Sequence, residues 1–409
     1  MLRTRYAVAW ITVSIGAALM GNGLLGSLMG VRAERDGIGA GVMGLTMAMY
    51  YVGFVFGMPV MSRLMEVLSR RRMFALATFV MGVSNLSYGL AVNPVAWLTL
   101  RFVTGFCLAG CYLVIETWLN DIAHNEVRGR VMGLYVAVVA AGLVAGQMVL
   151  ALTDPSSWIS FAIAGAITGL AWLPLLRVTN KAGVRHSRTG MMSLGQVARA
   201  VPSGVIGYLL VGVTQGCLMT MPAVYAARAG LSAAHVGLFV GCITAGAVVL
   251  QMPIGALGDR VSRRGVMVAL CAIAVALSAA LIIARPGSAT TCVLAFLLGG
   301  CSTPLYPLGN AYTHDWLPEG QVVAASSALL ITYSVGAVFG PLLAAAAMTM
   351  FGVNGFYWAL IIGHGLLAAF MTYRLIVAPD PTSDDDVIAA RALVSGFAPD
   401  RVPVAAGLD

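Results

Sequence analysis

The stretch GALGDRVSRR, residues 255–264, places one aspartate and three arginines between two long apolar runs. A similar stretch, SRLMEVLSRR, occupies residues 62–71, with Glu66 in the place of the aspartate. Charged residues make up only 10% of the 409-residue chain and hydrophobic residues make up 59%, whereas a soluble domain carries about 25% charged residues. The sequence therefore predicts an integral membrane protein in which one charged motif occurs twice.

The apolar runs around this motif are long enough to cross a bilayer, which takes about 20 residues of helix. Such runs lie near residues 6–31, 41–62, 73–92, 96–119, 131–152, 158–176, 203–226, 235–256, 266–284, 290–313, 321–350 and 354–377. The first run is too long for the apolar region of a signal peptide, so we interpret it as the first span. We expect an all-α membrane protein with twelve transmembrane helices.

The two charged motifs lie 193 residues apart, and this spacing predicts an internal repeat. Six spans return the chain to the side from which it started, so the repeat predicts two pseudo-symmetric six-helix bundles. The expected segments are a first bundle at 1–176, a linker loop at 177–202, a second bundle at 203–377 and a mobile cytoplasmic tail at 378–409. Internal repeats of this kind are typical of secondary transporters, which bind solutes near the bilayer midplane between the repeats.

The basic residues predict the orientation of the chain. Nineteen of them lie in loops on the side of both termini, and four lie in loops on the opposite side. Because loops rich in lysine and arginine stay in the cytoplasm, both termini are expected to be cytoplasmic. We assign the net charge of +8 to the membrane surface, and we expect no nucleic-acid partner.

The repeated loop resembles the signature of the major facilitator superfamily, Gly-x-Leu-x-Asp-Arg-x-Gly-Arg-Arg, which joins spans two and three and recurs between spans eight and nine. The positions that match it are Gly255, Leu257, Asp259, Arg260, Arg263 and Arg264 in the second half and Leu64, Glu66, Arg70 and Arg71 in the first. The positions that depart from it are Ser262 in the second half and Ser62, Val67 and Ser69 in the first. A span-four signature of the family, Arg-x-x-x-Gly-x-x-x-Ala, is met by Arg101, Gly105 and Ala109. Within the superfamily, residues 101–121 and 303–312 are most similar to the YcaD-like bacterial transporters.

This resemblance implies alternating access between two six-helix halves in the bacterial cytoplasmic membrane. It also implies that the charged loops brace helix ends in one conformation and release them in the other, with the first copy as the weaker one. The residues assigned to this conformational latch are Glu66, Arg70, Arg71, Asp121, Gly255, Asp259, Arg260, Arg263 and Arg264. We expect a monomer that is not an enzyme and uses no cofactor or metal.

Two ionisable residues lie inside span four, where such residues are costly and usually functional. Arg101 and Glu116 are 15 residues apart, about 22 Å along a helix and about 60° around it, so both can face one cavity without pairing. The resemblance suggests that Arg101 assists proton coupling or holds an anionic group; alternatively, it reaches the membrane surface or a backbone carbonyl. Glu116 is the best candidate for a proton carrier, because a carboxyl group in an apolar cavity can change protonation near neutral pH. The alternative for Glu116 is an ion pair with the loop arginines, a role that Asp121 and Glu126 fit better.

By the same resemblance, spans one, four, seven and ten line a central cavity, and spans two, five, eight and eleven contribute to it. The polar and aromatic candidates there are Asn22, Tyr50, Tyr112, Tyr135, Gln147, Gln215, Gln251, Tyr306, Asn310 and Tyr333. Such a lining suits a moderately apolar organic molecule with a few hydrogen-bonding groups. His364, in the peripheral twelfth span, is expected to be a structural histidine.

Several patterns in the sequence are explained by helix packing. GNGLLG, residues 21–26, matches Gly-x-Gly-x-x-Gly but lies within a span, without the strand and the downstream acid of a dinucleotide site. It is expected to allow close packing of helices, as are the pairs Gly142/Gly146 and Gly336/Gly340. The seven cysteines all lie in apolar runs and are expected to be small packing residues.

The sequence thus predicts a secondary active transporter for a small organic solute, with proton coupling favoured. A drug or metabolite efflux antiporter is the main alternative, although the Gly-Pro-x-x-Gly-Gly element of such exporters is reduced to Gly146-Gln147 in span five. A membrane sensor with the same fold would be expected to carry an added soluble domain. A channel would have no need for two latches.

Overall fold

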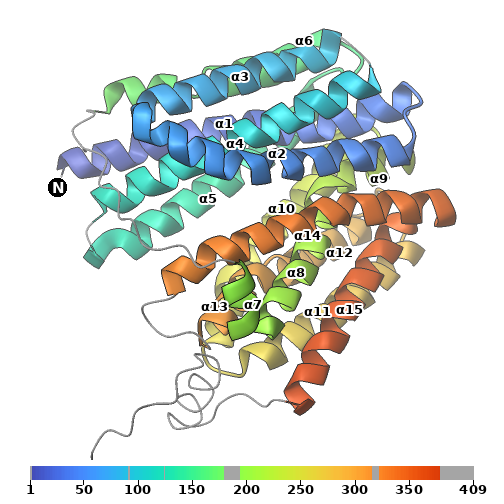
Figure 1. The fold of residues 1–409 in the computed structure, drawn as a ribbon. Coiled ribbons are helices and arrows are strands. Elements are labelled where there is room, and N and C mark those ends of the chain that lie inside the picture. Colours follow the sequence, from blue (N-terminus) through green and yellow to red (C-terminus); the bar gives the residue numbers. More distant parts are fainter. Residues whose placement is uncertain (1, 91–92, 124, 179–193, 316–321, 378–409) are drawn as a thin grey trace, which may run out of the picture.

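The computed structural model describes residues 2–90, 93–123, 125–178, 194–315 and 322–377. Two bundles of helices lie side by side in it, one coloured blue to green and the other green to red (Figure 1). This part of the chain contains twelve segments that are long and apolar enough to cross a membrane, and it contains no strand. The prediction of an all-α membrane protein with twelve spans is therefore confirmed. The predicted tail lies outside the described residues.

The first bundle begins at the N-terminus and takes in six spans. Its elements are α1 (Leu2–Arg35), α2 (Ala40–Val67), α3 (Arg70–Leu90), α4 (Pro94–Ile122), α5 (Asn125–Val149), α6 (Trp158–Gly169) and the 3-10 helices η1 (Leu150–Leu152) and η2 (Leu173–Arg177). The Asn93 side chain accepts hydrogen bonds from the backbone N–H groups of Val95 and Ala96 at the start of α4. Such a cap satisfies donors that the first turn of a helix leaves free.

The second bundle follows a short helix, α7, in the linker. Its elements are α7 (Leu194–Ala200), α8 (Pro202–Thr220), α9 (Pro222–Arg228), α10 (Ala233–Gly258), α11 (Arg263–Ile283), α12 (Ala289–Ser302), α13 (Leu305–Asp315), α14 (Val322–Phe351) and α15 (Gly355–Val377). Val197 of α7 is buried in a cluster with Tyr208 and Leu329. The segment expected as a linker loop therefore ends in a helix that packs on the bundle.

Spans seven and ten are broken helices, whereas the apolar runs suggest continuous ones. Span seven consists of α8 and α9, which meet at Met221 before Pro222, and span ten consists of α12 and α13, which are separated by Thr303 and Pro304. Proline has no backbone N–H to donate and its ring crowds the preceding turn, so a helix ends or kinks there.

Matching helices pack in the same pairs in both bundles. α1 packs on α5 as α8 packs on α14, α2 on α4 as α10 on α12, and α3 on α6 as α11 on α15. A side chain at Gly146 of α5 would collide with the backbone of Met20 in α1, and one at Gly340 of α14 would collide with the backbone of Val213 in α8. These glycines allow the close helix approach that their spacing predicts.

The molecule has two ends, which we name by their turns. The Arg-rich end carries the α2–α3 turn (68–69) and the α10–α11 turn (259–262), each of which is followed by arginines. The far end carries the turns at Gly37 and Gly230, which lie 193 residues apart and adopt φ angles of 69° and 78°. Glycine adopts such positive φ angles without strain, so the repeat extends to the geometry of these turns.

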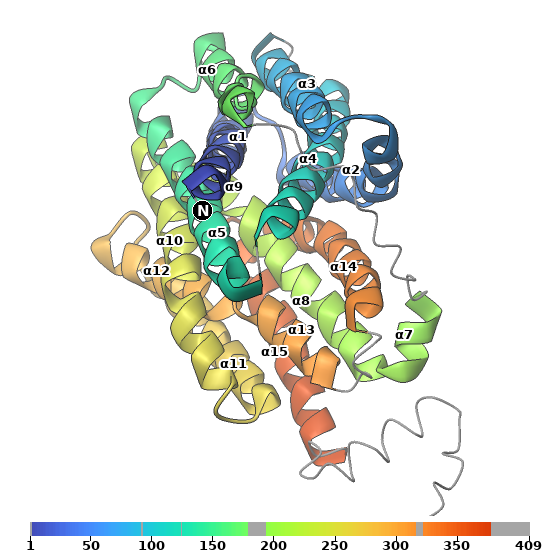
Figure 2. The same cartoon turned by 90° about the vertical axis from the view of Figure 1, so that its left-hand side faces the viewer.

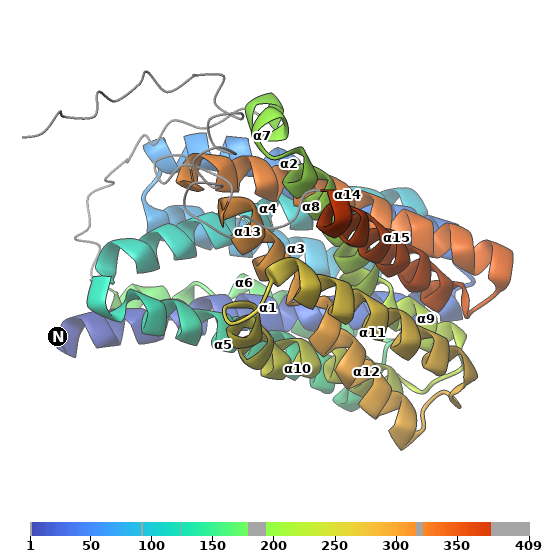
Figure 3. The same cartoon turned by 90° about the horizontal axis from the view of Figure 1, so that it is seen from below.

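The two bundles share a core only toward the far end. α2 packs on α14 and α5 packs on α10 across the interface (Figure 3). One buried cluster contains residues of both bundles, among them Met43, Phe239 and Ala344. The other buried clusters of the described residues, such as those around Trp118 and Leu308, each belong to one bundle and lie toward the Arg-rich end. Figure 2 views the molecule from that end, where the two bundles separate.

Candidate solute-binding cavity

A cavity of about 520 Å³ lies between the two bundles. Residues of α1, α2, α4 and α5 line it from the first bundle, and residues of α8, α9, α10, α13 and α14 line it from the second. Its floor is formed by buried side chains of the shared core, including Met47, Leu218 and Ile243. Glu116 and Met58 line it further toward the Arg-rich end. Because the bundles share a core only toward the far end, the cavity is closed there and opens toward the Arg-rich end.

Arg101 is a buried cation in the wall of this cavity, with 4% of its surface exposed. Its guanidinium carbon lies 5.5 Å from the centre of the Tyr50 ring, a cation–π contact. A side chain at Gly105, one turn along α4, would collide with the backbone carbonyl of Tyr50. The Arg-x-x-x-Gly spacing therefore brings α2 close enough to α4 for the tyrosine ring to reach the arginine.

Arg101 has no polar partner within the described part of the chain. Its Nε is buried and makes no hydrogen bond, and no ion pair of the described residues includes it. The other two buried arginines are bonded: Arg70 forms an ion pair with Asp121, and Arg264 donates to the Tyr312 hydroxyl over 2.9 Å. Arg101 thus differs from the arginines that hold the fold together.

Glu116 lies in the same cavity with its carboxylate exposed to it. The hydroxyl of Tyr135, which is buried on α5, donates a hydrogen bond to Glu116 Oε1 over 3.2 Å. Glu116 makes no ion pair with the described residues. Arg70, one of the loop arginines that could have paired with Glu116, forms its ion pair with Asp121 instead. The side chain of Glu126 lies outside the described residues. A carboxylate reached by water and held by one tyrosine can take up and release a proton.

Six of the ten polar and aromatic candidates line the cavity. They are Asn22, Tyr50, Tyr112, Gln147, Tyr306 and Tyr333. The structure places the other four elsewhere: Tyr135 lies behind Glu116, Gln215 is buried and donates to the backbone oxygen of Ser302 over 2.5 Å, and Gln251 and Asn310 lie nearer the Arg-rich end.

The sequence interpretation missed Thr244, which Gln147 contacts across the interface. The Gln147 amide donates to the Thr244 hydroxyl over 3.2 Å, from α5 of the first bundle to α10 of the second. Gly237 and Gly241 lie on the same face of α10, and a side chain at either would meet Gln147 or Met148. Gly237, Gly241 and Thr244 are spaced four and three residues apart, so they lie on one face of the helix. This spacing of small residues is the signal in the sequence that could have indicated the interface.

Each charged loop of the Arg-rich end is followed by an arginine that donates a hydrogen bond to a backbone carbonyl. Arg71 donates to the backbone oxygen of Val178 after η2, and Arg264 donates over 3.3 Å to that of Arg374 in α15. Each arginine therefore holds the last span of its own bundle. This contact agrees with the attraction of a helix C-terminus for cations.

The acids of the two loops are exposed and make no contact across the interface. Glu66 forms no ion pair with the described residues, and Asp259 pairs over 3.3 Å with Arg263, one turn further on. Gly255 has open space around it, and Arg260 is exposed. The first bundle adds the ion pair between Arg70 and Asp121.

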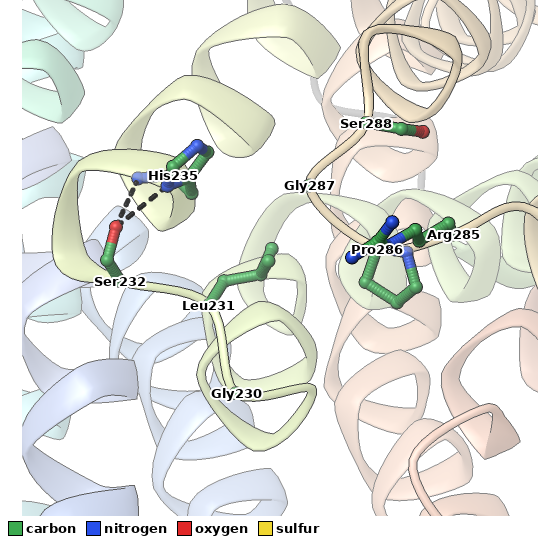
Figure 4. Close-up of a pocket in the computed structure, with 8 residues that line it drawn as sticks. All are labelled: Gly230, Leu231, Ser232, His235, Arg285, Pro286, Gly287 and Ser288. Carbon is green, nitrogen blue, oxygen red and sulfur yellow. Dashed lines mark hydrogen bonds between the residues drawn. The ribbon is translucent and has the colours of Figure 1, made fainter.

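A second hollow lies among the far-end turns of the second bundle (Figure 4). His235 is exposed there, and the Ser232 hydroxyl lies 2.8 Å from its Nδ1 while accepting from its backbone N–H. Ser288 likewise caps α12. These groups complete helix starts, so we do not assign a solute site to this hollow. His364 is fully buried, with Nδ1 2.9 Å from the Leu360 oxygen, as a structural histidine would be.

Comparisons with known proteins agree with this architecture. The family model described as Major Facilitator Superfamily matches residues 11–203 and 204–402. The uncharacterized MFS-type transporter YcaD of Escherichia coli is 26% identical over 333 residues, which cover 81% of this chain and 86% of that protein. A similarly named transporter of Enterobacter sp. (strain 638) is 27% identical over 338 residues, with the same coverage. The crystal structure of the nucleoside transporter NupG has the same fold, with a TM-score of 0.74 at 13% identity over 92% of this chain and 99% of that one. The chain therefore belongs to the major facilitator superfamily, and it is similar to the YcaD-like transporters.

Proposed function

We propose that the protein is a proton-coupled secondary transporter that moves a small organic solute across the bacterial cytoplasmic membrane by alternating access. The observation that carries the proposal is a central cavity whose walls come from both bundles and whose far end is closed by a core that they share. Because the arginine-rich loops are expected in the cytoplasm, this conformation is the inward-open state. Separation of the two bundles at the far end would open the same cavity to the outside.

The far-end closure includes an ion pair between the bundles. Arg228, the last residue of α9 in the second bundle, lies 3.2 Å from a carboxylate oxygen of Glu34 in the first. Within the first bundle, Arg35 lies 3.3 Å from Asp154. The partly exposed pair between the bundles contributes about 1 kcal/mol or less, so it leaves the closed and open states close enough in free energy to exchange.

Proton coupling is assigned to Glu116. In the inward-open state its carboxylate faces the water-accessible cavity, whereas closure of the Arg-rich end would remove that water. A carboxylate that loses its water without a cationic partner is costly. We infer that Glu116 is protonated before the bundles close around it, so that each cycle carries a proton with or against the solute.

The test of the proposed function is transport by purified protein in lipid vesicles with an imposed pH gradient. A panel of radiolabelled or mass-detected organic solutes should include at least one that the protein accumulates against its own gradient. Collapse of the pH gradient with a protonophore should remove that accumulation. An absence of transport across a broad panel would contradict the proposal, as would transport indifferent to the protonophore.

The second loop should matter more than the first for the rate of conformational exchange. We expect Asp259→Asn to lower the maximal transport rate about fivefold, a change of about 1 kcal/mol in the balance of states. Glu66→Gln, the matched change in the weaker copy, should have a smaller effect. Both residues lie outside the cavity, so the apparent affinity for the solute should be nearly unchanged. A large loss of affinity in Asp259→Asn would show that the loop takes part in solute binding.

A further inference from the structure

We propose that Arg101 binds the negative charge of the solute, and that the solute is an organic monocarboxylate with an apolar or aromatic body. This assignment rests on the proposed transport function and names the substrate class of the same cavity. Its basis is that Arg101 has no ion-pair or hydrogen-bond partner among the described residues. The side chain is 4% exposed, and its Nε makes no hydrogen bond. The guanidinium contacts the Tyr50 ring through a cation–π interaction.

A buried guanidinium without a protein partner is costly, because the part that the protein covers, here Nε, has lost its water without gaining a hydrogen bond. The described residues include two other buried arginines, Arg70 and Arg264, and both have partners. Of these three buried arginines, the one without a polar partner is therefore Arg101, which lines the cavity. A guanidinium offers two parallel N–H groups that match the two oxygens of a carboxylate, and a bound carboxylate would supply the missing partner.

The surroundings of Arg101 limit the charge and shape of the ligand. Among the described residues that line the cavity, Arg101 is the one cation and Glu116 is the one acid. A single negative charge balances this cation, whereas a phosphate group brings about two charges at neutral pH. Gly26 leaves open the space beside the Arg101 guanidinium, because an added Cβ there would still lie 3.9 Å from Nη2.

The rest of the lining suits an apolar body with a polar substituent. Leu19 and Tyr333 are examples of the aliphatic and aromatic side chains that make up most of the cavity wall. The buried amide oxygens of Asn22 and Gln147 have no hydrogen-bond partner, so they can accept from a hydroxyl or N–H group of the solute. The cavity therefore combines one charged contact, polar contacts beside it and a large apolar surface.

The first experiment measures binding without transport. Purified protein in detergent is heated with indole-3-acetate, 4-phenylbutyrate or benzoate, and each acid is compared with its amide and with an amine of the same ring. At least one carboxylate should raise the unfolding temperature of the wild type more than its amide and amine do. Arg101→Met should lower the binding affinity for that carboxylate about tenfold or more, because a hydrogen bond to a charged group is lost. If no carboxylate exceeds its amide, or if Arg101→Met binds it as tightly as the wild type, the assignment is overturned.

The second experiment needs no ligand and excludes a purely structural role. Without solute, Arg101→Met should unfold at the same temperature as the wild type or above it, because it removes an unpaired buried charge. The control Arg264→Met should unfold at a lower temperature, because it breaks the bonds to Tyr312 and Arg374. If Arg101→Met lowered the unfolding temperature as much as Arg264→Met does, the assignment would be overturned. Arg101→Lys keeps the charge but not the planar fork, and it should fold and bind the carboxylate with intermediate affinity.

These experiments separate the anion site from the transport function. A carboxylate that binds through Arg101 in detergent but is not moved in vesicles contradicts transport and supports the anion site. A neutral or cationic solute that the wild type and Arg101→Met accumulate equally supports transport and overturns the anion site.

Discussion

Glu116→Gln is expected to abolish accumulation of the solute driven by a pH gradient while retaining exchange of solute for solute. Glutamine keeps the size of the side chain and can still bond with the Tyr135 hydroxyl, but it cannot take up or release a proton. The bundles should therefore close around the cavity at any pH, with no proton carried in the cycle. The measurement compares gradient-driven uptake with counterflow in the same vesicles, and the expected result is the same for a symporter and for an antiporter.

Asp121→Asn is the matched control for this experiment. Asp121 is the next acid along α4, and it forms an ion pair with Arg70. Because Arg70 is buried, loss of its partner should lower the stability of the protein. Asp121 belongs to the latch, so transport should be slower, but the pH gradient should still drive accumulation of the solute. If Glu116→Gln accumulates the solute as the wild type does, proton coupling does not pass through Glu116.

The sequence alone predicts the twelve spans, because a bilayer demands long apolar helices and this chain has little charge elsewhere. It does not predict where a span is broken. Pro59, Pro253 and Pro341 lie inside continuous helices, whereas Pro222 and Pro304 coincide with breaks. The difference lies in whether neighbouring helices satisfy the backbone groups that proline leaves free, and a linear sequence does not contain that information.

Helix geometry predicts which residues share the cavity better than residue type does. Arg101 and Glu116 share a cavity because their spacing on one helix puts them within about 60° of each other. Gln215 has the polar character of a cavity residue, yet it is turned toward the backbone of Ser302. The rotation of α8 is set by packing on α14, where Gly212 and Gly336 bring the two helices together. Such contacts lie between distant segments, so polarity alone does not show which way Gln215 points.

The far-end closure depends on two glycines at equivalent positions of the repeat, Gly44 and Gly237. A side chain at Gly44 on α2 would collide with Pro341 and Ala345 on α14, and one at Gly237 on α10 would collide with the backbone of Gln147 on α5. Both contacts join one bundle to the other, so in the proposed transport cycle they would form when the far end closes and be lost when it opens. Each half of the repeat thus has a glycine at the same position, where one of its helices packs against a helix of the other bundle.

Gly44→Leu is therefore expected to favour the state that is open at the far end and to abolish transport. Forcing a bulky side chain into a packed interface costs about 1–3 kcal/mol, which changes the ratio of the two states by about 5-fold to 150-fold. Each bundle should still fold, because the contact lies between bundles. In a background without the native cysteines, Ala223→Cys on the cavity wall should become reactive to a membrane-impermeant maleimide added from outside.

Gly41→Leu is the control, because it makes the same change one turn earlier on α2, where no atom lies within 4 Å of the added Cβ. It should transport as the wild type does, and the cysteine at position 223 should react at the slower rate found when the same cysteine is placed in the otherwise wild-type protein. Gly237→Leu tests the equivalent crossing and should behave as Gly44→Leu does. Because both substitutions on α2 replace glycine by a good helix former, a difference between them reports the crossing and not the helix. Wild-type transport by Gly44→Leu would mean that the far end does not open along this interface, and alternating access between these two bundles would then need another closure.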